Sequence, residues 1–314
     1  LSHDFLFGAN CFLFGDLKTP EKNRRYEETF GALFNAATVA FYWKTLEQEQ
    51  GRPRFAADSS YATIGGGREN TIQSNSSYSA IGGGEYNDIR NDAENALIGG
   101  GRNHSIGTNT FICVVVGGAE NRIGPSVDGG LLGGGFRNDI LGSGSASART
   151  IAPAILSGSD NTIGDSDWSC IVAGDNNTIG SNAHLAVILG GRDCEVGAGA
   201  TNAMAAGRQA QANHQGAFVW GDDRAANIAS TNAHSVTFRA AGGYRLFSDG
   251  AATLGAALSP NATAWAALSD RNAKENFAPL DAAEILEKVA ALPVTAWTYK
   301  ADPEHRRYIG PVAQ

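Results

Sequence analysis

Residues 61–101 read YATIGGGRENTIQSNSSYSAIGGGEYNDIRNDAENALIGGG, and a short pattern returns within them. An apolar residue precedes each glycine cluster, and in the first two copies Asn, one residue and Ile follow two residues after the cluster. The first five clusters lie 17, 17, 18 and 16 residues apart. Helical repeats need about 33 to 45 residues for their helices and turns, so a period near 17 excludes them.

A period of this length fits one coil of a β-roll or β-solenoid, with two short strands and two turns. Glycine at the corners permits positive φ and close stacking between coils. We expect Tyr78, Ala80 and Ile98 to point inward while Ser and Thr point out. The repeated Asn either occupies a left-handed turn position or forms an inward ladder. The sequence thus predicts a mainly β fold.

Degenerate copies continue the pattern to about residue 216, for example at 161–163 and 177–179. The gap from about 135 to 157 is longer and contains Ser-Gly-Ser-Ala-Ser-Ala, which indicates a loop. On this pattern, residues 61–216 resemble the left-handed β-roll heads of trimeric autotransporter adhesins and the shafts of phage tail fibres. The resemblance implies a trimeric, structural role for the segment 59–216.

Other uses of glycine clusters do not fit. No cluster is followed by Lys and Ser or Thr, and no GxGxxG opens a helix, so a phosphate loop is not predicted. Calcium-binding coils need GGxGxD, and no regular Asp follows the glycines here. We therefore expect no cofactor and no metal.

The composition excludes several classes of protein. Gly makes up 40 of 314 residues and hydrophobic residues 42%, which together suggest many tight turns between short strands. A net charge of −8 lacks the basic surface that nucleic acid requires. No apolar run approaches 18 residues, so no membrane span is expected. The four cysteines form no metal-binding pattern, and we expect them to be small buried side chains.

Residues 217–268 have a different character and are expected to form a β-rich stalk. Residues 218–221 and 236–239 alternate apolar positions as strands do, and 240–247 indicate a hairpin around Gly242-Gly243.

The segment 269–314 begins SDRNAKENF and continues with an amphipathic helical pattern from about Asp281 to Leu292. Pro293 ends this helix, a strand containing Trp297 follows over 294–299, and the segment closes on IGPVAQ. This combination resembles the start of the S74 peptidase family, the intramolecular chaperone of endosialidase and other phage tail spikes. Those domains run further, so we expect either a truncated copy here or the first part of a longer chain. The resemblance implies that the segment assembles three chains and then cuts itself off between Leu268 and Ser269. It also implies that Ser269 is the nucleophile and Lys274 its base.

The chemistry of that pair sets conditions. A serine hydroxyl needs a neighbouring base, and a lysine serves as one only where burial lowers its pKa. A trimer interface would supply such burial. Because the segment would cut its own chain, the protein would be at most a single-turnover peptidase. In the alternative reading Ser269 or Asp270 caps a helix and Lys274 is solvated.

The segment 1–58 shows a helical pattern at 21–34 and a β pattern at 38–43. With Phe34-Asn35, Tyr42-Trp43 and the run EQEQG at 47–51, it resembles the first strand, helix and second strand of a family 10 glycoside hydrolase (xylanase). The family's sugar-holding positions are replaced by Thr38, Val39 and Tyr42, and six units of the barrel are missing. We expect no hydrolysis, and expect Glu47 and Glu49 to lie in a solvated loop.

We thus predict a structural homotrimeric fibre, located on a virion, outside the cell or on its surface. The alternative is a carbohydrate-binding or carbohydrate-active protein. Tyr61, Tyr78 and Tyr86 are either contacts to a cell-surface glycan or host receptor, or packing residues. Viral and bacterial origins both stay open.

Overall fold

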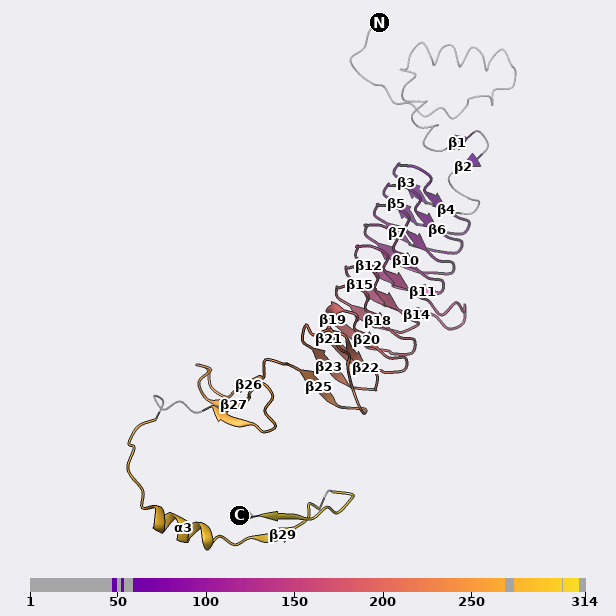
Figure 1. Ribbon diagram of the computed structural model, residues 1–314. Helices are drawn as coiled ribbons and strands as arrows, with labels where there is room; N and C mark the ends of the chain where they lie inside the picture. The colour runs from indigo at the N-terminus through magenta and orange to yellow at the C-terminus, as the bar shows by residue number, and fades with distance from the viewer. Residues whose placement is uncertain (1–46, 50–51, 54–58, 269–273, 301, 311–314) are drawn as a thin grey trace, which may run out of the picture. The chain divides into compact units, whose positions relative to one another are not determined.

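The computed structural model describes residues 47–49, 52–53, 59–268, 274–300 and 302–310 (Figure 1). The helix and strand expected at 21–43 and the predicted nucleophile Ser269 lie outside these residues. The chain divides into two units, one ending at Ala241 and one beginning at Gly242, and each is described by itself.

The first unit is a β-solenoid in which two parallel sheets run along a stack of coils of about 17 residues (Figure 1). One sheet has eleven strands: β3 (Thr63–Ile64), β5 (Ala80–Ile81), β7 (Leu97–Ile98), β9 (Val114–Val115), β12 (Leu131–Leu132), β15 (Ala154–Ile155), β17 (Cys170–Ile171), β19 (Val187–Arg192), β21 (Met204–Arg208), β23 (Phe218–Gly221) and β25 (Val236–Arg239). The other has ten: β4 (Thr71–Ile72), β6 (Asp88–Ile89), β8 (Ser105–Ile106), β10 (Arg122–Ile123), β13 (Asp139–Ile140), β16 (Thr162–Ile163), β18 (Thr178–Ile179), β20 (Glu195–Val196), β22 (Ala210–Ala212) and β24 (Ile228–Ala229). The predicted mainly β fold is confirmed.

Each coil places one branched apolar side chain from each sheet in the core. Ile81 and Ile98 are fully buried in the eleven-stranded sheet, as are Ile89 and Ile106 in the other. The parallel register sets each Ile on the equivalent residue of the next coil. Full burial of such a side chain contributes about 1.5–3 kcal/mol. One coil shields little surface by itself, so this contribution depends on stacking.

The repeated asparagines form the inward ladder. Asn87 donates from Nδ2 to Asn70 Oδ1 at 3.0 Å, to Gly83 O at 3.0 Å and to Gly101 O at 3.1 Å. Its backbone N–H also donates to Asn70 Oδ1, at 3.1 Å. The left-handed position is occupied instead by the preceding residue, such as Tyr86 with φ 58°. Of the two alternatives for the repeated Asn, the ladder is the one that forms.

The last glycine of each cluster is needed for this stacking. Gly84 has φ +94°, and a Cβ built on it would lie 2.0 Å from Gly101 O in the next coil. Neither the conformation nor the space accommodates a side chain there.

The expectation that Tyr78 and Ala80 point inward while Ser points out is wrong, whereas Ile98 is buried as expected. In β5 it is Ile81 that enters the core, and Ala80 faces outward. The Tyr78 side chain is 62% exposed, while Ser76 and Ser79 on either side are buried. Tyr78 has φ 59°, and a left-handed residue interrupts the alternation that a straight strand would maintain.

The long gap between repeats adds a short strand pair to the solenoid. Here β11 (Val127–Asp128) pairs in parallel with β14 (Thr150–Ile151). The Asn ladder continues across the insertion, with Asn161 Nδ2 donating to Asn138 Oδ1 at 3.0 Å. The extra residues therefore leave the core register unchanged.

The stretch 217–268, expected as one stalk, is divided between the two units. β23 and β25 extend the eleven-stranded parallel sheet. In the second unit β26 (Tyr244–Phe247), β27 (Gly255–Leu258) and β28 (Ala266–Leu268) form an antiparallel sheet. The predicted hairpin around Gly242-Gly243 is wrong, because β25 and β26 belong to different sheets.

The C-terminal segment contains α3 (Ala282–Ala290) and the antiparallel pair β29 (Thr295–Trp297) and β30 (Tyr308–Gly310). This agrees with the predicted helix and following strand. Near the other end, β1 (Glu47–Glu49) pairs antiparallel with β2 (Arg52–Pro53). Glu47 and Glu49 thus lie on a strand and not in the expected loop. Among the described residues, no helix is long and apolar enough to cross a lipid bilayer.

Candidate functional site

The residue before the predicted cut ends a strand at the edge of a small sheet. Among the described strands β28 pairs with β27 alone, and the last register pair joins Gly255 to Leu268. Leu268 is half-buried. A strand with one unpaired edge leaves part of its backbone free for other contacts, which suits a peptide bond that has to be reached for cleavage.

Of the two residues predicted to carry the chemistry, Ser269 lies outside the described residues. The other, Lys274, is exposed in the single chain. The burial on which a lysine base depends is therefore not provided within one copy. In the alternative reading Ser269 or Asp270 would be a helix cap. For α3 that role belongs to Asp281, whose Oδ1 accepts from the N–H of Ala283 at 2.9 Å.

The apolar side of α3 is uncovered. Ile285, Leu286 and Val289 are 41%, 69% and 56% exposed, and the helix has no buried residue. The neighbouring hairpin has its own small aromatic cluster, in which the rings of Trp297 and Tyr308 stack with centroids 5.0 Å apart. An amphipathic helix without a partner for its apolar side is the kind of element that packs against further protein.

Residues 269–314 match the family Peptidase S74, described as chaperone of endosialidase. This confirms the resemblance inferred for the C-terminal segment. No curated protein matches the chain. The resemblances of 61–216 to adhesin heads and of 1–58 to a glycoside hydrolase stay predictions.

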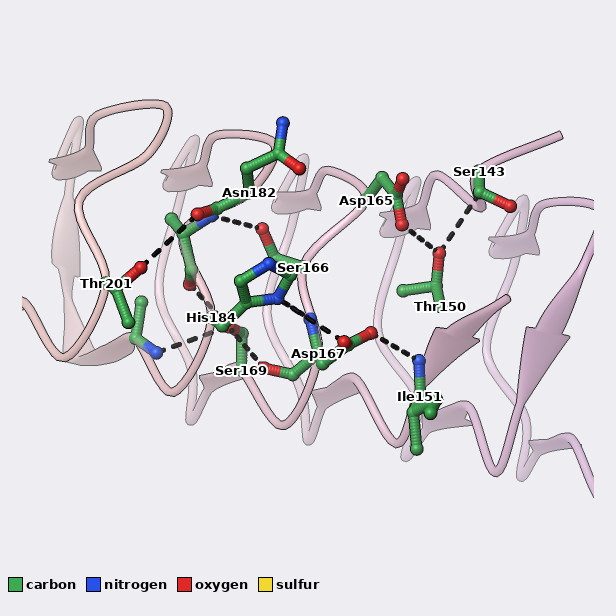
Figure 2. Close-up of polar contacts among 12 residues, drawn as sticks. Ser143, Thr150, Ile151, Asp165, Ser166, Asp167, Ser169, Asn182, His184 and Thr201 are labelled. Carbon is green, nitrogen blue, oxygen red and sulfur yellow. Dashed lines mark hydrogen bonds and ion pairs between the residues drawn. The ribbon is translucent and has the colours of Figure 1, made fainter. Parts of the chain in front are cut away.

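A second cluster brings together the residue types of a serine hydrolase, but its hydrogen bonds do not fit that role (Figure 2). Ser166 Oγ donates to Gly180 O at 2.7 Å and accepts from Ala183 N at 2.8 Å. His184 Nδ1 lies 3.5 Å from Asp167 Oδ2, but it accepts the backbone N–H of Asp167 at 3.0 Å and so is not a hydrogen-bond donor to that carboxylate. A catalytic histidine would hydrogen-bond to both the serine hydroxyl and the carboxylate. These side chains instead join neighbouring coils.

A pocket of about 430 Å³ lies on the flank of the solenoid beside the insertion, lined by Asp92, Glu94, Asn109, Thr110, Phe111, Asp128 and Arg149. Arg149 donates to Asn109 Oδ1 at 3.0 Å and to Asn109 O at 2.7 Å, and also pairs with Asp128. No local sequence pattern predicted this pocket. The one signal in the sequence was the longer repeat that contains the insertion. In the structure it brings Arg149 into contact with Asn109, 40 residues earlier in the chain.

The remaining predicted side chains lie at separate places. Tyr61 and Tyr78 stack with ring centroids 5.0 Å apart on one corner, whereas Tyr86 lies under the guanidinium of Arg68. Cys113 and Cys194 are buried as expected, and burial raises the pKa of the Cys113 thiol to about 11. Cys170 is only half-buried, against the expectation, and Cys11 lies outside the described residues. Within the described parts of the chain, no three His, Cys, Asp or Glu side chains gather to hold a metal.

Proposed function

We propose that this protein is the shaft of a homotrimeric fibre of the tail-fibre or tail-spike type, acting on a virion or outside the cell. Its C-terminal segment aids assembly and is then released by cleavage between Leu268 and Ser269. The observation that carries the proposal is the family match at 269–314, beginning directly after β28. The solenoid supports it, since stacked coils make a long, quasi-one-dimensional body.

In the proposed cleavage, Ser269 Oγ attacks the carbonyl carbon of Leu268 and gives its proton to Lys274. The amide nitrogen of Ser269 leaves with a proton, so that an ester joins Leu268 to Ser269 Oγ. Water then hydrolyses the ester and frees the carboxylate of Leu268. Exposure of Lys274 in one copy supports a cut that follows assembly, because neighbouring copies would then supply the burial.

Intact mass of the protein expressed from its complete gene tests this proposal. The wild type should give a product ending at Leu268, while Ser269→Ala and Lys274→Met stay uncut. Lys288→Met is the matched control, because Lys288 is also exposed and forms an ion pair with Glu284 along α3. An uncut wild type, or cleavage in Ser269→Ala, would remove the self-cleavage proposal.

A second candidate function, binding of a glycan, is favoured by the pocket on the flank. Carboxylate, amide, hydroxyl and guanidinium groups there surround Phe111, which is 41% exposed. Polar groups around an aromatic side chain suit a polyhydroxylated ligand. Binding to an array of oligosaccharides that is lost in Phe111→Ala, but kept in Phe136→Ala, would support this candidate. No binding by the wild type would exclude it for the sugars on the array.

A further inference from the structure

The outward side of the eleven-stranded sheet is apolar along almost its whole length. Strand register stacks one outward residue from each strand into a continuous row, which begins at the polar Thr63 of β3. Its other ten members are apolar: Ala80, Leu97, Val114, Leu131, Ala154, Cys170, Val187, Met204, Phe218 and Val236. A second outward row, two residues further along each strand, contains Val116, Leu156, Val172, Leu189, Trp220 and Phe238. We call these two rows the apolar face. Neither row contains a charged residue.

The ten-stranded sheet presents the opposite chemistry. Its outward row reads Thr71, Asp88, Ser105, Arg122, Asp139, Thr162, Thr178, Glu195 and Gln211. Arg122 and Asp139 form an ion pair of 2.6 Å on this side. The two sheets bury the same kind of side chain inward, so the difference lies only in what faces outward.

Among the described residues of the first unit, none covers the apolar face. Val116, Leu156 and Leu189 are 55%, 43% and 51% exposed. With strands about 4.8 Å apart and rows about 7 Å apart, the ten strands that carry apolar residues make a strip of about 45 Å by 10 Å. The area of this strip is on the order of 500 Å². Soluble monomers rarely expose contiguous apolar patches larger than a few hundred Å², and such patches are often interaction surfaces.

We propose that the apolar face is the surface through which copies of this chain associate in parallel about a common axis. A partner has to offer apolar side chains at the same step of about 4.8 Å over the same length, and a second copy does so by its own repeat. Identical faces meet without repulsion because the rows carry no charge. The inference rests on the proposed trimer and adds which side of the solenoid forms it.

Paired lysine substitutions test the proposal in the full-length protein. Leu156→Lys with Leu189→Lys places charges at positions that are exposed in a single copy and would be buried in the assembly. Thr162→Lys with Thr178→Lys is the matched control on the ten-stranded sheet. Light scattering should give trimers for the wild type and the control, and monomers with an unchanged far-ultraviolet circular dichroism spectrum for the leucine variant. A trimer formed by the leucine variant would overturn the assignment of this face.

Cross-linking provides a measurement that needs no destabilising change. Cys170 lies in the first row, whereas Cys113 and Cys194 are buried. In a Cys11→Ser background, a short bis-maleimide should join two copies, and Cys170→Ser should prevent it. A trimeric protein that forms no cross-link through Cys170 would overturn the inference. A monomeric, folded wild type would overturn it as well, and would leave the face to a different partner.

These outcomes separate the inference from the proposed function. Cleavage is read from mass, and the face is read from assembly. A trimeric but uncut wild type would contradict the cleavage alone, and a cut trimer unaffected by the leucine substitutions would contradict the face alone.

Discussion

The two sheets of the solenoid differ on one side only. Inward, Ile140 of the ten-stranded sheet and Leu132 of the eleven-stranded sheet are both fully buried. Outward, the neighbours of these residues are Asp139, which forms an ion pair, and Leu131, which continues an apolar row. A repeat of two-residue strands therefore specifies the core with one residue and the outer surface with the other, and the two can evolve separately.

The largest effect is expected where the sheets are alike. Ile140→Ala and Leu132→Ala should each lower the free energy of unfolding by about 2–5 kcal/mol, because each leaves a cavity in a stacked core. Urea denaturation followed by circular dichroism measures both. Thr178→Ala, at an exposed outward position, is the control. A large loss in only one of the two variants would show that the sheets do not share one core.

A smaller loss is expected from the ladder that both sheets share. Asn138→Ala removes bonds to Gly134 O and Gly158 O and leaves the N–H of Asn161 without its acceptor. Gly158 O keeps a backbone donor, so the main cost is the buried N–H of Asn161, and a total loss of about 1–3 kcal/mol is expected. The same denaturation measurement applies. Thr162→Ala at an outward position should change little, and a neutral Asn138→Ala would mean that packing alone holds the coils.

Truncation on the outward sides should separate the sheets. Val187→Ala removes methyl groups from the apolar face and should weaken association by about 1–2 kcal/mol per copy. The control is Glu195→Ala. Glu195 lies on β20, the next strand of the ten-stranded sheet, and its truncation should leave association unchanged. Dilution series followed by light scattering measure this difference. Equal effects from both changes would remove the distinction between the two outer surfaces.

The smallest effect concerns acid. His104 occupies an Asn position of the ladder, where its Nδ1 accepts the N–H of Asn121 at 3.2 Å. Burial lowers its pKa below the ordinary 6.5, against the raising influence of backbone groups at Gly118 and Asn121. The unfolded chain therefore binds the proton more readily. As far as His104 is concerned, the free energy of unfolding is highest above about pH 6.5. It falls as the pH drops from there toward the pKa of His104 in the folded protein.

His104→Asn should remove this acid loss, since Asn121, Asn138 and others fill the same position without titrating. The pH dependence of the two proteins is compared by their urea midpoints at neutral pH and at about pH 5. Carboxylates begin to titrate near and below the lower of these values. An identical pH dependence in both proteins would exclude His104 as its source.

The sequence was informative wherever one residue type returned at a fixed spacing. The glycine clusters and Asn-x-Ile predicted coils of about 17 residues, and their Ile side chains are the core. It failed at corners, because left-handed residues such as Tyr78 break the alternation between inward and outward positions. The end of the solenoid predicted at residue 216 was also too early. β23 and β25 continue the parallel register beyond that point, although the glycine clusters no longer occur there.

The candidate site divides in a similar way. Ser269 and Lys274 came from the resemblance of the C-terminal segment, because Ser and Lys five residues apart specify nothing by themselves. The pocket beside Arg149 depends on a contact across 40 residues, which no local pattern reveals.

By itself, the sequence determined the coil: its period, its inward Ile and the glycines that let coils approach. Only the tertiary structure decided what lies on the outside, because stacking brings residues about 17 positions apart to within about 4.8 Å. A single apolar residue per coil is unremarkable in the sequence. Ten of them in register form the first row of the apolar face.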